Sequence, residues 1–310
     1  MTVALTQAGK GTPDARAVVR GLLGAYAVFT IALAVHRNVG AGAWAPALVV
    51  LAFLGAERWW TQRTVRRAIY GTSAADIAWT LVPLLLIPML YAQIAPLVAS
   101  IPMHDATILA LEHRWFGDPS SEWAQRWNSP TLSMLLHACY IAYYGIIYVP
   151  PLYLAWQGRQ SALAVTVLAL ACAFLPVFAF FILWPVEGPR YRVAAATDRS
   201  LDPMRLAATA ILERFASRGA AFPSSHVLVS VVQTMIAWRT QPRMAAFLSV
   251  LTVGLAAGAV YGGFHYLMDV IVGASTGALI AAAVLWYTRG LSLRAANARL
   301  RDARHMEPRR

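Results

Sequence analysis

Long apolar segments, separated by short polar ones, run along almost the whole chain, and this pattern predicts transmembrane helices. Most of these segments approach the roughly 20 residues that a helix needs to cross a bilayer core. Charged residues gather at the ends of the segments and are scarce in their interiors. We therefore expect about eight spans, at residues 17–35, 42–60, 76–99, 130–155, 161–184, 225–239, 244–262 and 269–288.

The basic residues give these spans an orientation. With eight spans, the main basic clusters all fall on one side of the membrane. Cytoplasmic segments carry an excess of Lys and Arg, so this side is expected to be the cytoplasm, with both termini inside. The residues concerned are Lys10, Arg16, Arg20, Arg58, Arg63, Arg66, Arg67, Arg159, Arg239, Arg243, Arg289, Arg294, Arg299, Arg301, Arg304, Arg309 and Arg310.

The composition agrees with a membrane protein and excludes several other classes. Hydrophobic residues make up 59% of the chain and charged residues only 13%. Soluble domains contain roughly 45–50% hydrophobic and about 25% charged residues. The net charge of +12 could suggest a nucleic-acid partner, but the bases lie at span ends, so we expect none. Both cysteines, Cys139 and Cys172, fall inside spans, which speaks against a disulfide framework or a zinc site.

Two segments on the outer side carry other signals. Residues 185–224 hold more arginines than carboxylates, an excess that the topology does not require and that suits an anionic substrate. Residues 103–130 mix tryptophans with charges, as in an amphipathic segment at the membrane interface. We expect its polar residues to lie on solvated faces, with headgroup recognition as the alternative. They are His104, Asp105, Glu112 and His113.

Three polar stretches at the outer span ends carry the candidate chemistry: residues 184–192, 222–226 and 261–270. Arg190 can grip two phosphate oxygens, and Ser224 and Ser225 begin a helix, where free N–H groups favour an anion. His265 and Asp269 are four residues apart and share a helix face, so the carboxylate can orient the imidazole as a nucleophile or base. In the third stretch Gly262 and Gly263 allow close approach of the backbone to a ligand. In the second stretch His226 can donate a proton to a leaving alkoxide.

These residues carry a resemblance to a known family. The sequence GPR at 188–190, PSSH at 223–226 and HYLMD at 265–269 resembles the type 2 phosphatidic acid phosphatase superfamily. That superfamily has three motifs: a basic one ending in Arg-Pro, a Pro-Ser-x-His, and a Ser-Arg followed by His-x-x-x-Asp. The order and spacing of the second motif and of the His/Asp pair agree with it. The resemblance covers roughly residues 76–288.

The chain also departs from the family pattern. Leu183 stands where the family has a lysine, Tyr191 where it has a proline, and Gly258 and Ala259 where it has Ser-Arg. The inositolphosphorylceramide synthase-like branch also lacks that arginine. Its Phe-Pro-Ser-x-His is similar to FPSSH here, and its segment before the core is similar to DATILALEHRWFGDPS. The chain therefore resembles this branch most closely.

The resemblance implies a fold and a mechanism. It implies an all-α integral membrane protein, with an N-terminal transmembrane hairpin (1–75), a six-helix catalytic core (76–289) and a basic cytoplasmic tail (290–310). His265 is implied to attack phosphorus and form a phosphohistidine, Asp269 to orient it, and His226 to protonate the leaving oxygen. Arg190, Ser224 and Ser225 would hold the phosphoryl oxygens, and Arg192 could replace a missing basic contact. This scheme requires no metal or other cofactor.

The predicted activity is phosphoryl transfer from a lipid phosphate or phospholipid, at the outer face of a bacterial plasma membrane. Water as acceptor makes the enzyme a phosphatase, which we favour, and a lipid or polyol hydroxyl makes it a phosphotransferase. A flippase or transporter is the alternative class, but it predicts polar residues at mid-membrane rather than at span ends.

Structural roles for single residues also stay open. His226, His265 and Asp269 could form a two-His, one-carboxylate metal site. His265 could bridge helices, Asp269 could cap one, and Arg190 could anchor the chain at the interface. Gly273 and Gly277 form a GxxxG that we interpret as a helix-packing seam.

Overall fold

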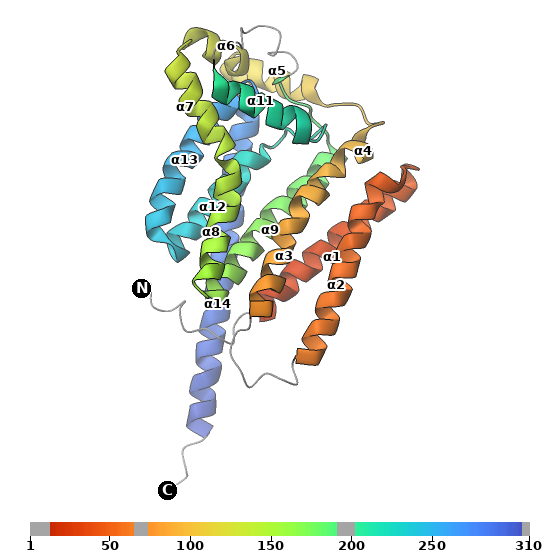
Figure 1. The fold of residues 1–310 in the computed structure, drawn as a ribbon, viewed down its shortest axis with the longest axis vertical. Helices are drawn as coiled ribbons and strands as arrows, with labels where there is room; N and C mark the ends of the chain where they lie inside the picture. The colour runs from red at the N-terminus through yellow and green to blue at the C-terminus, as the bar shows by residue number, and fades with distance from the viewer. Residues whose placement is uncertain (1–12, 65–73, 191–201, 306–310) are drawn as a thin grey trace.

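The protein is a bundle of α-helices (Figure 1). The structure, a computed structural model, describes residues 13–64, 74–190 and 202–305, with side chains for 15–63, 74–190 and 202–289. The long helices lie roughly side by side, and three shorter ones gather at one end of the bundle. The helices are α1 Pro13–His36, α2 Ala41–Thr64, α3 Ala74–Ala92, α4 Ile94–Val98, α5 Asp105–Phe116, α6 Pro119–Arg126, α7 Pro130–Ile141, α8 Tyr143–Trp156, α9 Gln160–Leu183, α11 Pro203–Phe215, α12 Ser225–Thr240, α13 Pro242–Tyr261 and α14 Leu267–His305.

The described helices confirm an all-α integral membrane protein. Six stretches are long and apolar enough to cross a bilayer: Ala15–His36, Ala41–Arg63, Ala74–Val98, Gln160–Leu183, Pro242–Tyr261 and Leu267–Arg289. The pair α7 and α8, bent by 42°, gives a seventh if it is one span. Helix α12 has 16 residues and is about 24 Å long at 1.5 Å per residue, short of the roughly 30 Å core. The count of eight spans therefore stays a prediction.

A cap of short helices covers one end of the bundle. Helices α5, α6 and α11 gather there (Figure 1). Helix α11 lies within the segment 185–224, for which the sequence analysis predicted no helix. Its start has a clear physical basis: the Asp202 side chain accepts from the amides of Met204 and Arg205, and Pro203 occupies the first turn.

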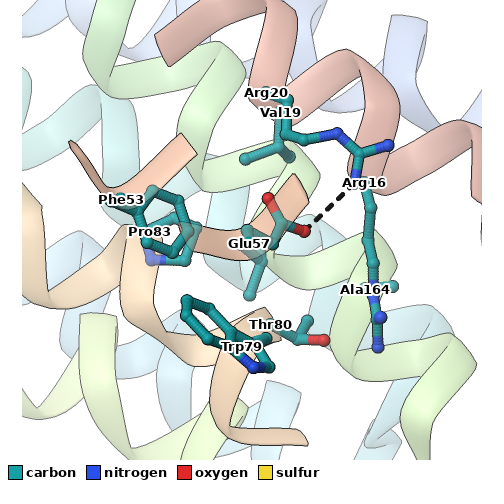
Figure 2. Close-up of a pocket in the computed structure, with 10 residues that line it drawn as sticks. Arg16, Val19, Arg20, Phe53, Glu57, Trp79, Thr80, Pro83 and Ala164 are labelled. Carbon is teal, nitrogen blue, oxygen red and sulfur yellow. Dashed lines mark hydrogen bonds and ion pairs between the residues drawn. The ribbon is translucent and has the colours of Figure 1, made fainter. Parts of the chain in front are cut away.

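The N-terminal hairpin α1–α2 packs against α9 and carries polar contacts near the opposite end of the bundle, and Figure 2 shows the ion pair within the hairpin. Arg20 forms an ion pair of 3.1 Å with Glu57, which is 5% exposed. Arg16 donates to the carbonyl oxygen of Asp76, and Gln160 donates to the same oxygen from α9. Arg16, Arg20 and Glu57 line a small void of about 20 Å³. The Arg16 hydrogen bond joins the hairpin to α3, whereas the Arg20 ion pair joins α1 to α2 and the Gln160 hydrogen bond joins α9 to α3.

Helices α12 and α14 pack closely, and this packing sets where the two helices begin relative to each other. A Cβ at Gly273 would lie 2.6 Å from the carbonyl oxygen of Ser224, and one at Gly277 would lie 2.5 Å from that of Leu228. No side chain fits at such distances, so the two glycines let the backbones touch. The predicted packing seam is confirmed. Helix α14 then continues without a break through the basic tail to His305.

Candidate active site

The predicted site residues come together where four helix ends meet, under the cap. Helices α9 and α13 end there, and α12 and α14 begin there. His265 lies in the turn between α13 and α14, and Asp269 in the first turn of α14. The Nδ1 atom of His265 is 3.3 Å from Oδ2 of Asp269, which also accepts from the backbone N–H of Tyr266. Asp269 therefore fixes both the imidazole and the turn that carries it.

His265 is held in a neutral form by its surroundings. The side chain is almost fully buried, and this burial lowers the pKa of His265 from 6.5 to about 4. A backbone hydrogen bond to Ala221 opposes the shift, and the charge of Arg190 adds to it. A neutral imidazole keeps a free lone pair, which a nucleophile requires.

His226, in the first turn of α12, stands next to His265. Their ring centroids are 5.7 Å apart. Two tyrosines of the neighbouring helices flank the His226 ring, Tyr140 stacked at 5.1 Å and Tyr143 tilted at 4.2 Å. Among the described residues, the Nδ1 atom of His226 has no hydrogen-bond partner. The ring is thus held in place by packing, while one nitrogen stays available for proton transfer.

The start of α12 is tied to the start of α14. The backbone N–H of Ser224 donates to the carbonyl oxygen of Asp269, and the Ser224 hydroxyl accepts from the amide of Val227 as an N-cap. The Phe222–Pro223 peptide bond before it is cis. Both Ser224 and Ser225 are buried. Their position at a helix N-terminus suits an anion.

Arg190 reaches the site from the segment after α9. A short parallel β-bridge pairs Val186 with Ala220 and so joins this segment to the one before α12. Gly188 has φ of +88°, and a Cβ there would lie 3.0 Å from the Ala221 Cβ and 3.3 Å from the Phe264 carbonyl oxygen. All three motif segments therefore meet at Gly188. The charge of Arg190 acts on His265, which favours a role at the site over a membrane anchor.

The remaining predicted residues are placed as follows. Arg192 lies outside the residues that the structure describes. A Cβ at Gly258 would lie 2.4 Å from the carbonyl oxygen of Leu136 in α7, so this helix occupies the space that the family serine would need. Ala259 is fully buried, and its carbonyl oxygen accepts from the amides of Phe264 and His265.

Two carboxylates of α5 hold the site loops, a role that the sequence analysis missed. The expectation of solvated faces was wrong for Glu112, which is 0% exposed. Its oxygens accept from the amides of Leu267 and Met268, at 2.8 and 2.9 Å. Glu112 therefore caps the start of α14 together with Asp269, which accepts from the amide of Tyr266. Burial raises the pKa of Glu112, although these amides act against the shift.

Asp105 holds the segment that carries Arg190 by accepting hydrogen bonds from its backbone amides. Its two oxygens accept from the amides of Glu187 and Gly188, at 2.9 and 2.8 Å. The backbone N–H of His104 also donates to the carbonyl oxygen of Pro185. The sequence does show that the two carboxylates share one face of an amphipathic helix, because they are seven residues apart. It does not show which amides they bind, because these lie about 80 and 155 residues further along the chain.

Two cavities adjoin the site. An apolar cavity of about 510 Å³ lies between α3, α8, α9 and α11, with many of its walls aromatic, and it reaches Ser225 and His226. A second cavity of about 330 Å³, called the polar cavity because half of its lining residues are charged or polar, is lined by Arg190, Gly262 and Phe264 together with residues of α11 and the segment after it.

The residues gathered at the site suit anion binding and proton transfer. Among the residues described, no group of three or more His, Cys, Asp and Glu is arranged to hold a metal ion. The PAP2 superfamily model matches residues 106–284. No curated protein and no solved structure matches the chain. The family match runs from α5 into α14 and spans more than half of the chain, which therefore belongs to the PAP2 superfamily.

Proposed function

We propose that this protein is a lipid phosphate phosphatase embedded in a bacterial plasma membrane, with its site facing outward and with a phosphohistidine intermediate on His265. Membership of the PAP2 superfamily supports a phosphatase or phosphotransferase activity. The lipid is supported by one observation above all: the apolar cavity of about 510 Å³ has His226 in its wall. An acyl or prenyl chain in this cavity would bring its ester oxygen to the proton donor.

In the first step the free ring nitrogen of His265 attacks phosphorus. The bond between phosphorus and the lipid oxygen breaks, and protonated His226 gives its proton to that oxygen, so that a neutral lipid alcohol leaves. The phosphoryl group is then bonded to His265. Asp269 holds the other ring nitrogen and stabilises the positive charge that develops on the imidazole, as the aspartate of a catalytic triad does.

In the second step water replaces His265 on phosphorus, with His226 as the base. His226, now neutral, takes a proton from a water molecule, whose oxygen attacks phosphorus and breaks its bond to His265. Inorganic phosphate is released, and both side chains return to their starting forms. Arg190 and the amides at the start of α12 are proposed to hold the non-bridging oxygens, on which charge develops in both steps.

The leaving group provides the test of this scheme. A lipid alkoxide needs a proton and a nitrophenolate hardly does, so we expect His226→Ala to slow bond cleavage strongly with a lipid phosphate and far less with an aryl phosphate. The rate of formation of the phosphoenzyme is to be measured in single turnovers. Ser224→Ala serves as the matched variant, because it should slow both substrates alike. Equal losses for His226→Ala on the two substrates would exclude the acid role.

A phosphotransferase remains the second candidate, because His226 lines the apolar cavity. A lipid alcohol that enters this cavity would present its hydroxyl to the same base that activates water. Incubation of the purified protein with a lipid phosphate and a lipid alcohol distinguishes the two. Free phosphate supports the phosphatase, and a new phospholipid supports the phosphotransferase.

A further inference from the structure

The polar cavity beside the site is rich in arginine. Three arginines line its volume of about 330 Å³: Arg190, Arg205 of α11 and Arg218. Glu213 is the acidic residue in the same wall. Arg218 is also paired with Glu187, at 3.1 Å, at an exposed position. The lining thus keeps a positive excess, which suits an anionic ligand.

Two of these arginines come from outside the family motifs. The motif positions that would supply further basic groups hold Leu183 and Ala259. Leu183 is 57% exposed on the surface of the bundle, and Ala259 is buried beneath α7 and the site turn. Phe264, which precedes His265, lines the same cavity as Arg205. Besides Arg190, the basic groups of this cavity are therefore supplied by α11 and the segment after it.

Helix α11 is fixed so that Arg205 has a defined position. Asp202 caps the helix and also accepts from the Ser133 hydroxyl of α7. Nδ1 of His137 lies 3.4 Å from Oδ2 of Asp202. Arg205 itself is only 6% exposed. A guanidinium held in this way loses little conformational freedom when it binds an anion.

The cavity is larger than the reacting phosphoryl group needs. At roughly 30 Å³ for each water molecule in the liquid, its volume corresponds to about eleven waters. One phosphoryl group fills a small part of this space. We propose that the cavity under α11 binds a second anionic group of the lipid substrate, of phosphate-like chemistry, with Arg205 as its principal ligand. This inference rests on the proposed function, since it names the class of substrate.

The first experiment measures binding without turnover. His265→Ala protein in detergent is titrated with inorganic phosphate and with inorganic pyrophosphate by calorimetry. One further charge-assisted contact predicts that pyrophosphate binds at least about tenfold more tightly. Arg205→Gln in the same background should remove this advantage, whereas Arg126→Gln, at an exposed site on α6, should keep it. Equal affinities for the two anions would overturn the proposal.

The second experiment identifies the source of the second charge. Lipid monophosphates and diphosphates with one tail are compared, together with lipid phosphodiesters that have or lack a phosphorylated headgroup. We expect Arg205→Gln to raise KM at least about tenfold for the lipids with two anionic groups and far less for the others. An equal rise for all substrates would instead place Arg205 on the reacting phosphoryl group and contradict the proposal.

Two controls keep these outcomes separate. If Arg205→Gln fails to fold, Arg218→Gln, whose side chain is 55% exposed, provides the same comparison with a smaller expected effect. Pyrophosphate binding without any turnover of lipid phosphates would refute the proposed function, but it would still support the anion site. Normal turnover without a preference for two charges would refute the anion site alone.

Discussion

Replacement of Glu112 tests whether α5 holds the catalytic turn in place. Glu112→Ala leaves the amides of Leu267 and Met268 without the acceptors that they now have at 2.8 and 2.9 Å. An unsatisfied buried donor costs about 1–3 kcal/mol. The two amides belong to residues of intermediate exposure, so water can replace part of the loss. We therefore expect the free energy of unfolding to fall by about 2–4 kcal/mol.

The same change should affect catalysis, because Asp269 follows these amides in the first turn of α14. A displacement of about 1 Å in a catalytic group can cost roughly a hundredfold in rate, so we expect kcat to fall by about 10- to 100-fold. Glu112→Gln keeps one acceptor oxygen and should lose about half as much stability. The assays are denaturant unfolding in mixed micelles and turnover of an aryl phosphate. Glu122→Ala, at an exposed site on α6, is the control, and equal behaviour of the Glu112 and Glu122 variants would refute the reasoning.

Three further predictions follow from the site and the bundle. Because burial lowers the pKa of His265 to about 4, His265 stays neutral above that pH. The acidic limb of kcat/KM, corrected for substrate ionisation, should therefore lie near pH 4, and a pKa near 6.5 for His265 in an NMR titration of the active protein would contradict this. Gly258→Ser, which restores the family serine, should destabilise the protein by about 1–3 kcal/mol through overpacking against Leu136. An unchanged melting temperature would mean that α7 moves to admit the serine side chain, and would contradict this prediction. In protein without native cysteines, Gln62→Cys and Gln125→Cys should be labelled from opposite sides of the membrane, the first from the cytoplasm, and labelling from one side would exclude the predicted topology.

The sequence was sufficient for those parts of the structure that leave a local pattern. Apolar stretches predicted most ends of the long helices to within a few residues, because a bilayer requires length and apolarity in one segment. The exceptions are α14, which continues to His305, and the expected span 130–155, which is two helices, α7 and α8. The four-residue spacing of His265 and Asp269 predicted their contact. The position of the three polar stretches at outer span ends predicted that Arg190, Ser224 and His226 would meet His265 at one end of the bundle.

The parts that the sequence analysis missed depend on contacts between distant residues. Helix α11 is short and polar, and the local signal of Asp202 followed by Pro203 was not used. Glu112 and Asp105 looked like solvated residues of an interfacial helix, since nothing near them in the chain shows that they accept backbone hydrogen bonds. Arg205 was counted in the basic excess of its segment, but its place beside Arg190 follows only from the position of α11.

The central claim is that His265 carries the phosphoryl group during turnover, and it can be measured directly. His226→Ala protein is mixed with an aryl phosphate, which needs no proton donor to leave, and is then quenched and analysed by peptide mass spectrometry. Loss of the base that activates water should let the phosphoenzyme accumulate. We predict an acid-labile phosphoryl group on His265, and none in the His226→Ala, His265→Ala double variant. Release of the aryl alcohol in a burst with no phosphoryl group on His265, or with the group on another residue, would contradict the account.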